Sequence, residues 1–221
     1  MTGRLVVITG TGTEIGKTHV TEAVLLALKA GGLRAAGLKP VESGVGEGVS
    51  DATRLAKASS FHVKPFGVAL KAPVSPHRAA RAEGVRLDLG KLAAGVHSAL
   101  GDVDLLLVEL PGGLFTPLAG ETLNVDFAAR LRPDDLLLVA PDRLGVLHEV
   151  LATTRAAGAA GVPIRGIVLV APERPDASTG ANDEDLGAYT SIPVLATVPR
   201  GTPAVLATDP SVALIVAAIR R

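Results

Sequence analysis

The chain has 221 residues, 48% of them hydrophobic, and its 22 basic and 22 acidic side chains give a formal net charge of zero. This length favours one domain with a large core, and the balanced charge argues against a general surface for nucleic acid or an anionic membrane. The absence of cysteine excludes disulfides, thiolate metal sites and cysteine nucleophiles. Because no leader pattern and no apolar stretch of about 20 residues occurs, we expect a cytoplasmic protein.

Short aliphatic runs alternate with longer segments of helical spacing along the whole chain. The predicted strands are Leu5–Thr9, Ala35–Leu38, Val103–Glu109, Asp135–Ala140, Ile164–Val170 and Val194–Val198. The predicted helices are Lys17–Ala30, Asp51–Ser59, Asp88–Leu100, Val125–Leu131, Gly145–Ala157 and Ser211–Arg220. Glycine- and proline-rich composition predicts loops at Ser43–Ser50 and Pro172–Asn182. This alternation predicts an α/β fold, a single domain over residues 1–221, with a mostly parallel sheet covered by helices on both faces.

The first predicted strand leads into a Gly/Thr-rich turn, and the first helix opens at Gly16-Lys17-Thr18. In such a turn, backbone N–H groups and the positive helix N-terminus converge on phosphate oxygens. We expect the Lys17 ammonium on the terminal phosphates and the Thr18 hydroxyl on Mg²⁺. The first glycine, Gly10, stands one residue earlier than the G-x-x-x-x-G-K-[ST] pattern requires. The sequence therefore predicts a P-loop NTPase fold, with nucleotide contacts from Gly12, Thr13, Glu14, Ile15, Gly16, Lys17 and Thr18.

Three further ionisable side chains stand next to predicted strand ends, where parallel sheets bind their ligands. Lys39 follows the second strand, Asp51 opens the next helix, and Glu109 ends a third, apolar strand. Both carboxylates, together with the Thr18 hydroxyl, form an oxygen-rich set suited to Mg²⁺, and Lys39 supplies a second positive charge for an anion. The alternatives are a solvated lysine at Lys39 and an ordinary helix N-cap at Asp51.

Five sequence blocks occur in the order found in a known enzyme family. The phosphate loop carries an extra residue and an internal Thr13-Glu14. The other blocks are Lys39-Pro40-Val41-Glu42-Ser43-Gly44, Ser50-Asp51, Ser75-Pro76-His77, and Glu109-Leu110-Pro111-Gly112-Gly113 with Thr116-Pro117-Leu118. On these residues the chain resembles the dethiobiotin synthetases, the ATP-dependent enzymes that close the ureido ring in biotin synthesis.

The resemblance implies a homodimeric ligase that uses ATP, Mg²⁺, CO₂ and the diamine 7,8-diaminononanoate. One amine would form a carbamate, which attacks the γ-phosphate to give a carbamic-phosphoric anhydride, and the second amine would close the ring. Catalysis of this kind is mainly positioning and charge stabilisation. The resemblance implies catalytic roles for Lys39, Lys17, Thr13 and Glu14, and substrate contacts from Ser43, Gly112, Gly145 and His148. The carboxylate tail of the substrate would reach the partner subunit.

Four positions depart from the family pattern. Gly12 replaces an Asp, Pro111 removes a backbone donor from its loop, and His148 replaces an Asn that helps bind the substrate carboxylate. The adenine-reading Asn-Asp pair is Ala171-Pro172, and neither side chain can hydrogen-bond a base edge. We therefore expect weak nucleobase discrimination, with other NTPs accepted, or nucleotide contacts moved to Pro199 and Arg200.

Two other functions fit the phosphate loop. A switch ATPase of the ParA/MinD class would carry a signature lysine four residues before the second glycine of the loop, where this chain has Gly12. A degenerate paralogue that binds nucleotide but a different substrate is favoured by Pro111 and His148. A related amidoligase with a glutaminase domain is disfavoured, because such a domain needs a nucleophilic cysteine and the chain has none.

Overall fold

The computed structural model describes residues 3–46, 48–64 and 66–221. Its central strands are β1 (Arg4–Gly10), β2 (Ala35–Leu38), β5 (Leu105–Glu109), β8 (Asp135–Pro141), β9 (Gly166–Val170) and β10 (Val194–Val198). They form one six-stranded sheet in the order β10-β9-β8-β1-β5-β2, and every neighbouring pair is parallel. All six predicted strands are present, so the predicted fold class is confirmed.

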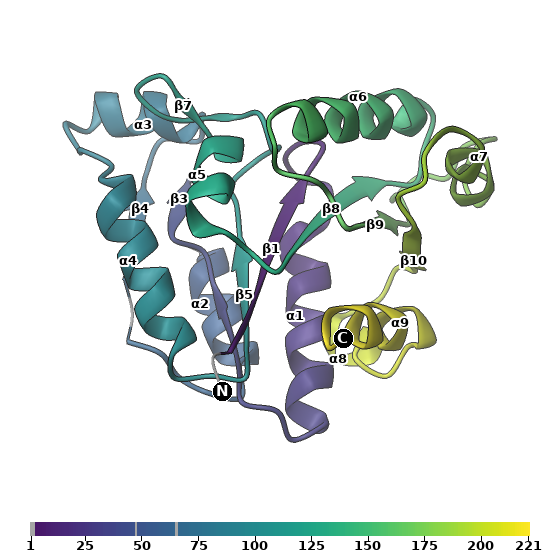
Figure 1. Ribbon diagram of the computed structural model, residues 1–221, viewed down its shortest axis with the longest axis horizontal. Coiled ribbons are helices and arrows are strands. Elements are labelled where there is room, and N and C mark those ends of the chain that lie inside the picture. The colour runs from purple at the N-terminus through teal and green to yellow at the C-terminus, as the bar shows by residue number, and fades with distance from the viewer. Residues whose placement is uncertain (1–2, 47, 65) are drawn as a thin grey trace.

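Helices cover both faces of this sheet (Figure 1). One face packs against α1 (Lys17–Ala30), α2 (Asp51–Ala58), α8 (Pro203–Leu206) and α9 (Pro210–Ile219). The other face packs against α4 (Leu89–Leu100), α5 (Asn124–Leu131), α6 (Val146–Ala159) and α7 (Asn182–Tyr189). The side chains of β1 alternate between the two cores, with Val6 and Ile8 on the first face and Leu5 and Val7 on the second. Among the described helices, none is long and apolar enough to cross a membrane.

Short elements lie outside the central sheet and were not predicted. They are the parallel pair β3 (Val41–Ser43) and β4 (Val68–Leu70), helix α3 (Pro76–Ala82), and the hairpin β6 (Pro117–Ala119) with β7 (Thr122–Leu123). Ser43, expected in a loop, is the last residue of β3, whereas position 47 of the same predicted loop lies outside the described residues. The predicted loop Pro172–Asn182 ends one residue early, because α7 begins at Asn182.

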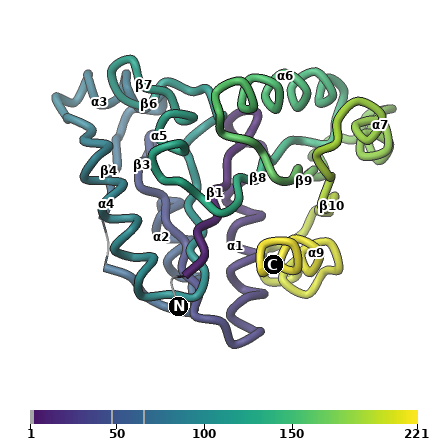
Figure 2. The backbone as a smooth tube through the Cα atoms, viewed as in Figure 1, coloured from purple at the N-terminus to yellow at the C-terminus, as the bar shows by residue number. Residues whose placement is uncertain are grey.

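The carboxyl ends of the strands meet at one edge of the sheet, at the top of Figure 1 between α3 and α6. The N-terminus lies at the opposite edge in the same view (Figure 2). The register pairs Ile8 of β1 with Glu109 of β5, and Gly10 with Val139 of β8. This register brings the loops after β1, β2 and β5 together, which is where ligands of open α/β sheets bind.

Candidate active site

Two residues of the phosphate loop have positive φ angles, which occur in neither a regular strand nor a regular helix. Gly16 has φ 93°, a backbone conformation that favours glycine, and a Cβ at this position would lie only 3.1 Å from Val170 Cγ1. Glu14 has φ 55°, the left-handed region, which costs a non-glycine residue roughly 1 kcal/mol. Strain of this kind is characteristic of ligand-binding loops. Helix α1 starts at Lys17, directly after Gly16.

The loop after β5 packs directly on the phosphate loop. The backbone N–H of Leu114 donates to the carbonyl of Gly10 at 3.0 Å. A Cβ on Gly113 would lie 3.0 Å from the carbonyl oxygen of Thr11, so the approach of the two chains requires glycine here. The buried side chain of Asn124 donates to the carbonyls of Pro111, at 2.5 Å, and Gly113, at 2.8 Å. The two loops therefore form one rigid wall of the site.

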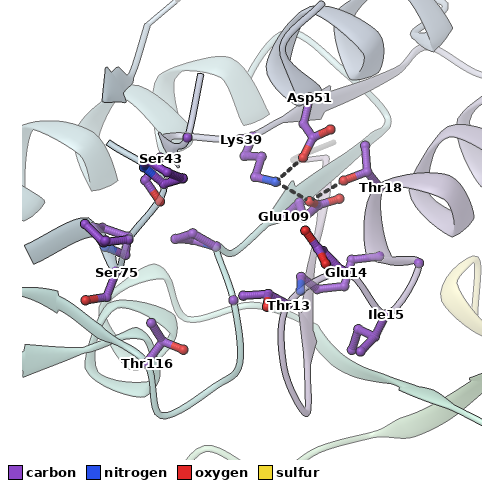
Figure 3. A pocket seen from close by; sticks show the side chains of 18 of the residues that line it. Thr13, Glu14, Ile15, Thr18, Lys39, Ser43, Asp51, Ser75, Glu109 and Thr116 are labelled. Atoms are coloured by element: carbon purple, nitrogen blue, oxygen red, sulfur yellow. Dashed lines mark hydrogen bonds and ion pairs between the residues drawn. The ribbon is translucent and has the colours of Figure 1, made fainter. Parts of the chain in front are cut away.

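Four of the predicted site residues form a single ionic cluster (Figure 3). The Lys39 ammonium lies 2.5 Å from Asp51 Oδ2 and 2.8 Å from Glu109 Oε1. The Thr18 hydroxyl donates to the same Glu109 oxygen at 2.8 Å, and the Thr21 hydroxyl donates to Oε2 at 3.3 Å. Glu109 has an exposed fraction of 0%, so its charge depends on these partners. Lys39 is thus an ion-pair partner of both carboxylates rather than a solvated lysine.

At both Lys17 and Lys39, burial lowers the pKa and the neighbouring carboxylates raise it. Burial opposes the charged form of Lys39, but Glu109 and Asp51 outweigh it and raise the pKa of Lys39 above its ordinary value. Burial likewise lowers the pKa of Lys17 to about 8, because Glu109 offsets it only in part. The Lys17 ammonium donates to the carbonyl of Gly12 at 2.6 Å. An anion placed beside Lys17 would raise this pKa again, because a neighbouring negative charge favours the ammonium form.

Asp51 is held by a clamp that the sequence analysis did not predict. Ser50 caps α2 by accepting from the backbone N–H of Thr53 at 3.2 Å, so Asp51 is not the N-cap. Instead, Arg54 donates to Asp51 Oδ1 at 3.2 Å and to Glu22 Oε2 at 2.5 Å. The spacing of Asp51 and Arg54 is a helical i,i+3 pair, which could have indicated half of this clamp. The contribution of Glu22 arises only when α1 packs against α2.

These groups line one end of a cavity of about 710 Å³. The other end is uncharged and carries the hydroxyls of Ser43, Ser75 and Thr116, with Pro73 and Val74 beside them (Figure 3). The predicted site residues on its wall are Thr13, Glu14, Ile15, Gly16, Lys17, Thr18, Lys39, Ser43, Asp51, Glu109 and Gly112. The cavity therefore offers a cationic subsite and a hydroxyl-lined subsite in one continuous space.

Five predicted site residues do not line this cavity: Gly12, Gly145, His148, Pro199 and Arg200. Gly12 approaches it only through its carbonyl, which accepts from Lys17. Gly145 has φ 94° and directly precedes α6, with His148 in the first turn of that helix. The loop with Pro199 and Arg200 lies beside the first turn of α1, because a His19 ring nitrogen contacts the carbonyl of Gly201.

The oxygen atoms of the ionic cluster are suitable ligands for a hard divalent cation. Asp51, Glu109 and the Thr18 hydroxyl offer only oxygen atoms, which Mg²⁺ prefers. In the described part of the chain, no three or more His, Asp or Glu side chains are grouped so as to hold a metal by themselves. Mg²⁺ is commonly bound by one or two carboxylates together with substrate phosphates, and the arrangement beside Lys17 suits that mode.

Structural comparison gives the same fold. The chain matches the MinD protein complexed with Mg-ADP from Pyrococcus horikoshii OT3 with a TM-score of 0.58 and 20% identity, covering 99% of this chain and 94% of that one. It matches the MinC:MinD cell division complex of Aquifex aeolicus with a TM-score of 0.61 and 16% identity, covering 99% and 95%. At these identities the likeness shows a P-loop NTPase fold and nothing about substrate.

Sequence comparison shows the family. The model of an AAA domain family matches residues 4–205. An "ATP-dependent dethiobiotin synthetase BioD" from Rhodopirellula baltica is 38% identical over 213 residues, covering 86% of this chain and 82% of the relative. A protein of the same name from Anaeromyxobacter dehalogenans is 37% identical over 199 residues, covering 87% and 88%. Taken with the phosphate loop and its ionic cluster, these matches show that the chain belongs to the ATP-dependent dethiobiotin synthetase family.

Proposed function

We propose that this protein makes dethiobiotin from 7,8-diaminononanoate, CO₂ and ATP, with Mg²⁺ as cofactor. Family membership supports the reaction, and one observation supports it in this chain. The cavity of about 710 Å³ joins the charged cluster at the phosphate loop to an uncharged chamber lined by hydroxyls. A switch ATPase needs the first subsite alone, whereas a ligase must hold a nucleotide and a second substrate side by side.

The proposed reaction has three steps. One amine of the substrate adds to CO₂ and loses a proton, giving a carbamate. A carbamate oxygen then attacks the γ-phosphorus, and the bond between that phosphorus and the β-phosphate oxygen breaks. ADP is the leaving group, and the product is a carbamic-phosphoric anhydride. The second amine attacks the anhydride carbonyl, phosphate departs with the C–O bonding electrons, and loss of a proton completes the cyclic urea.

The protein would contribute position and charge rather than covalent chemistry. Lys17 would hold the terminal phosphates, and Lys39 would face the negative charge that gathers on the carbamate and phosphoryl oxygens. Thr13, Glu14 and Ser43, on the cavity wall, would face the diamine. Mg²⁺, held through Thr18, Asp51 and Glu109, would neutralise phosphate charge when bound. Gly112 would contribute backbone contacts to the same substrate.

The nucleobase would be read weakly. Ala171 and Pro172 follow β9 and carry no side-chain hydrogen-bonding group. In the loop after β10, the exposed Arg200 is a cationic side chain that could contact the nucleotide. We therefore propose that Pro199 and Arg200 contact the nucleotide and that several NTPs serve. Turnover with ATP, CTP, GTP and UTP, each at a concentration below its KM, tests this idea. A strong preference for adenine would contradict it.

The protein would be cytoplasmic and would act as a homodimer. A second subunit would explain why Gly145 and His148 lie away from the cavity of their own chain. Leu144, immediately before Gly145, is 75% exposed and is therefore free to pack against a second subunit. The start of α6 in one subunit would then receive the carboxylate of the substrate bound to the other, through its helix N-terminus. Light scattering with Leu144→Asp tests the arrangement, because the charged variant is expected to be monomeric.

The decisive experiment measures products. Purified protein, Mg-ATP, bicarbonate and the diamine should yield dethiobiotin by mass spectrometry, with one phosphate released per ring closed. Omission of either the diamine or bicarbonate should abolish phosphate release. Phosphate release that needs neither compound, and that a protein partner stimulates, would instead favour a switch ATPase. Nucleotide binding without stabilisation by the diamine would favour a paralogue with another substrate.

A further inference from the structure

A second cavity, of about 680 Å³, lies beside the active site between four segments that are distant in sequence. Its walls come from α3, from residues 85–90 before and at the start of α4, from the β6–β7 hairpin, and from Arg130 of α5. Figure 2 shows α3 and the hairpin side by side at the upper left. The fold, rather than any local sequence motif, assembles this cavity.

The ionisable side chains of this second cavity are mostly positive. Arg81, Arg86, Arg130 and His77 line it, against a single carboxylate, Asp88. The chain as a whole has a formal net charge of zero, so this excess is local. Within residues 3–46, 48–64 and 66–221, none of the three guanidinium groups forms an ion pair with an acidic side chain. Three exposed arginines thus line one concave surface, and within the described residues none of them forms an ion pair with a carboxylate.

The two acidic residues that line this cavity and the neighbouring one each accept a hydrogen bond at a helix start. Asp88 is the N-cap of α4 and accepts from the backbone N–H of Lys91 at 3.0 Å. That hydrogen bond, helped by the nearby Arg86, lowers the pKa of Asp88. A neighbouring cavity shares Arg130 and adds Arg132 and one acid, Asp126. Asp126 in turn accepts from the backbone N–H of Leu123 at 2.7 Å. Each carboxylate thus already accepts a backbone hydrogen bond, and neither forms an ion pair with an arginine of the cavity among the described residues.

His77 is positioned to add a donor. Its Nδ1 lies 3.0 Å from the Ser75 hydroxyl. When that hydroxyl donates to Nδ1, the neutral ring carries its proton on Nε2, which can then donate to a ligand. Ser75 and Pro76 line the active-site cavity, whereas His77 and Arg81 line the second one. Helix α3 is therefore a wall common to both cavities.

We propose that the second cavity binds a small oxyanion of the phosphate class, with Arg81, Arg86 and Arg130 as its charge partners and His77 as a hydrogen-bond donor. Guanidinium groups pair with phosphate oxygens through parallel N–H donors, which makes arginine the suited residue. The second cavity is small and the chain has a formal net charge of zero, which suits a small anion. A nucleic acid would need an extended basic surface. The anion is either free phosphate or the phosphoryl group of a small metabolite.

The test must separate this site from the phosphate loop. Thermal unfolding is measured with saturating Mg-ADP in the phosphate loop, while inorganic phosphate or glycerol 3-phosphate replaces chloride at constant ionic strength. We expect the unfolding midpoint to rise with phosphate, and the variant Arg81→Gln/Arg130→Gln to raise the apparent dissociation constant about 10-fold or more. A larger effect of glycerol 3-phosphate would identify a phosphorylated metabolite, and an equal effect would identify free phosphate.

Arg78→Gln is the matched control, because Arg78 is an exposed arginine of the same helix that does not line the cavity. It should bind phosphate as the unaltered protein does. Circular dichroism and Mg-ADP affinity of the double variant should be unchanged, which shows that it is folded. Equal phosphate stabilisation in the double variant, or none beyond chloride in the unaltered protein, would overturn the proposal. Dethiobiotin formation is not measured, so the outcome is independent of the proposed activity.

Discussion

The two halves of the ligand-binding edge are built differently. The phosphate half consists of the loops after β1, β2 and β5, and its lysines and Glu109 are the buried part of the site. Lys17, Lys39 and Glu109 are all buried or nearly so, and each is bonded to a neighbour within the site. The distal half consists of the loops after β8, β9 and β10. There Ala171 and Pro172 have no polar side-chain atoms, and Arg200 is exposed.

A buried carboxylate, Asp142, holds the backbone of the distal half in place. Asp142, which is 2% exposed, accepts from the backbone N–H of Gly180 at 2.9 Å and from the Asn182 amide at 2.6 Å. It fastens the loop after β9 without facing the cavity. Charged and hydroxyl-bearing side chains are thus concentrated in the phosphate half, where we propose that the phosphates and the second substrate meet. The distal half supplies a shaped surface with few groups able to recognise a base.

The largest effect should follow removal of Lys39. Lys39→Ala takes away the cation between Asp51 and Glu109, and we expect kcat for dethiobiotin formation to fall by about 10²–10³-fold. Steady-state kinetics measures this loss. Lys57→Ala is the control, since Lys57 is an exposed lysine of α2 away from the cavity. A loss of less than about tenfold for Lys39→Ala would remove Lys39 from the proposed mechanism.

Glu109 should matter for stability as much as for chemistry. Glu109→Ala leaves the buried ammonium of Lys39 with only Asp51, and breaking such a pair costs about 3–5 kcal/mol of unfolding free energy. Urea unfolding measures this cost. The double variant Lys39→Met/Glu109→Ala should recover part of it, because no buried charge is then left unpaired. Additive losses in the two single variants would show that the pair is not coupled.

The clamp on Asp51 should have an intermediate effect. Arg54→Ala frees Asp51 Oδ1, and removal of such a supporting partner typically weakens metal binding about 10–100-fold. The Mg²⁺ concentration that half-saturates binding of a fluorescent nucleotide reports this directly, without turnover. Glu22→Gln should reproduce part of the effect, because Glu22 fixes the guanidinium. Lys57→Ala again serves as the control, and an unchanged Mg²⁺ requirement in Arg54→Ala would contradict the clamp.

In the distal half the effects should be smaller. Arg200→Ala removes a single exposed cation, and loss of a stacking or charge contact of roughly 0.5–1 kcal/mol corresponds to a rise in KM of about threefold for each NTP. We expect kcat to stay constant and the ratios among the four nucleotides to change little. A change confined to one nucleotide would show that Arg200 recognises a base, and the contrast between the two halves would be weaker.

The smallest effect concerns pH and Asp176, in the loop after β9. Hydrogen bonds from Ser178 and from the backbone N–H of Leu144 lower the pKa of Asp176 from 3.8 to about 2. Because the folded pKa is depressed, the stabilisation is present above pH 3.8 and is lost as the pH falls through about 2. Asp176→Asn should therefore lower the unfolding midpoint slightly at pH 7, and the difference should vanish near pH 2. A difference that persists there would indicate a contact independent of charge.

Much of the sheet could be predicted because buried parallel strands are nearly continuous apolar runs. Ala35–Leu38 and Val194–Val198 have the predicted bounds, as does helix Lys17–Ala30. The strand predicted from Val103 begins at Leu105, because the turn after α4 extends further than its apolar residues indicated. Helix α3 was missed, since seven residues with proline at the start and two arginines give no apolar periodicity.

The ionic cluster could be predicted because its members follow strands that end at the same edge. The partners that orient them could not, because they depend on how helices pack. Glu22 reaches Arg54 only across the contact between α1 and α2, and Glu149 of α6 accepts from the Thr11 hydroxyl at 3.0 Å across the sheet edge. Family resemblance suggested Gly145 and His148, which a single chain does not bring to the cavity.

The position of Lys39 affects how the protein would bind Mg²⁺. An ammonium already lies between the two carboxylates, so the folded chain does not have to tolerate adjacent, unbalanced negative charges before a divalent ion arrives. If Mg²⁺ binds here as proposed, it would exchange with the ammonium of Lys39, and the displaced lysine would become available to the incoming anions. Folding would then not require the metal ion, and we expect a chelator to abolish activity without unfolding the protein.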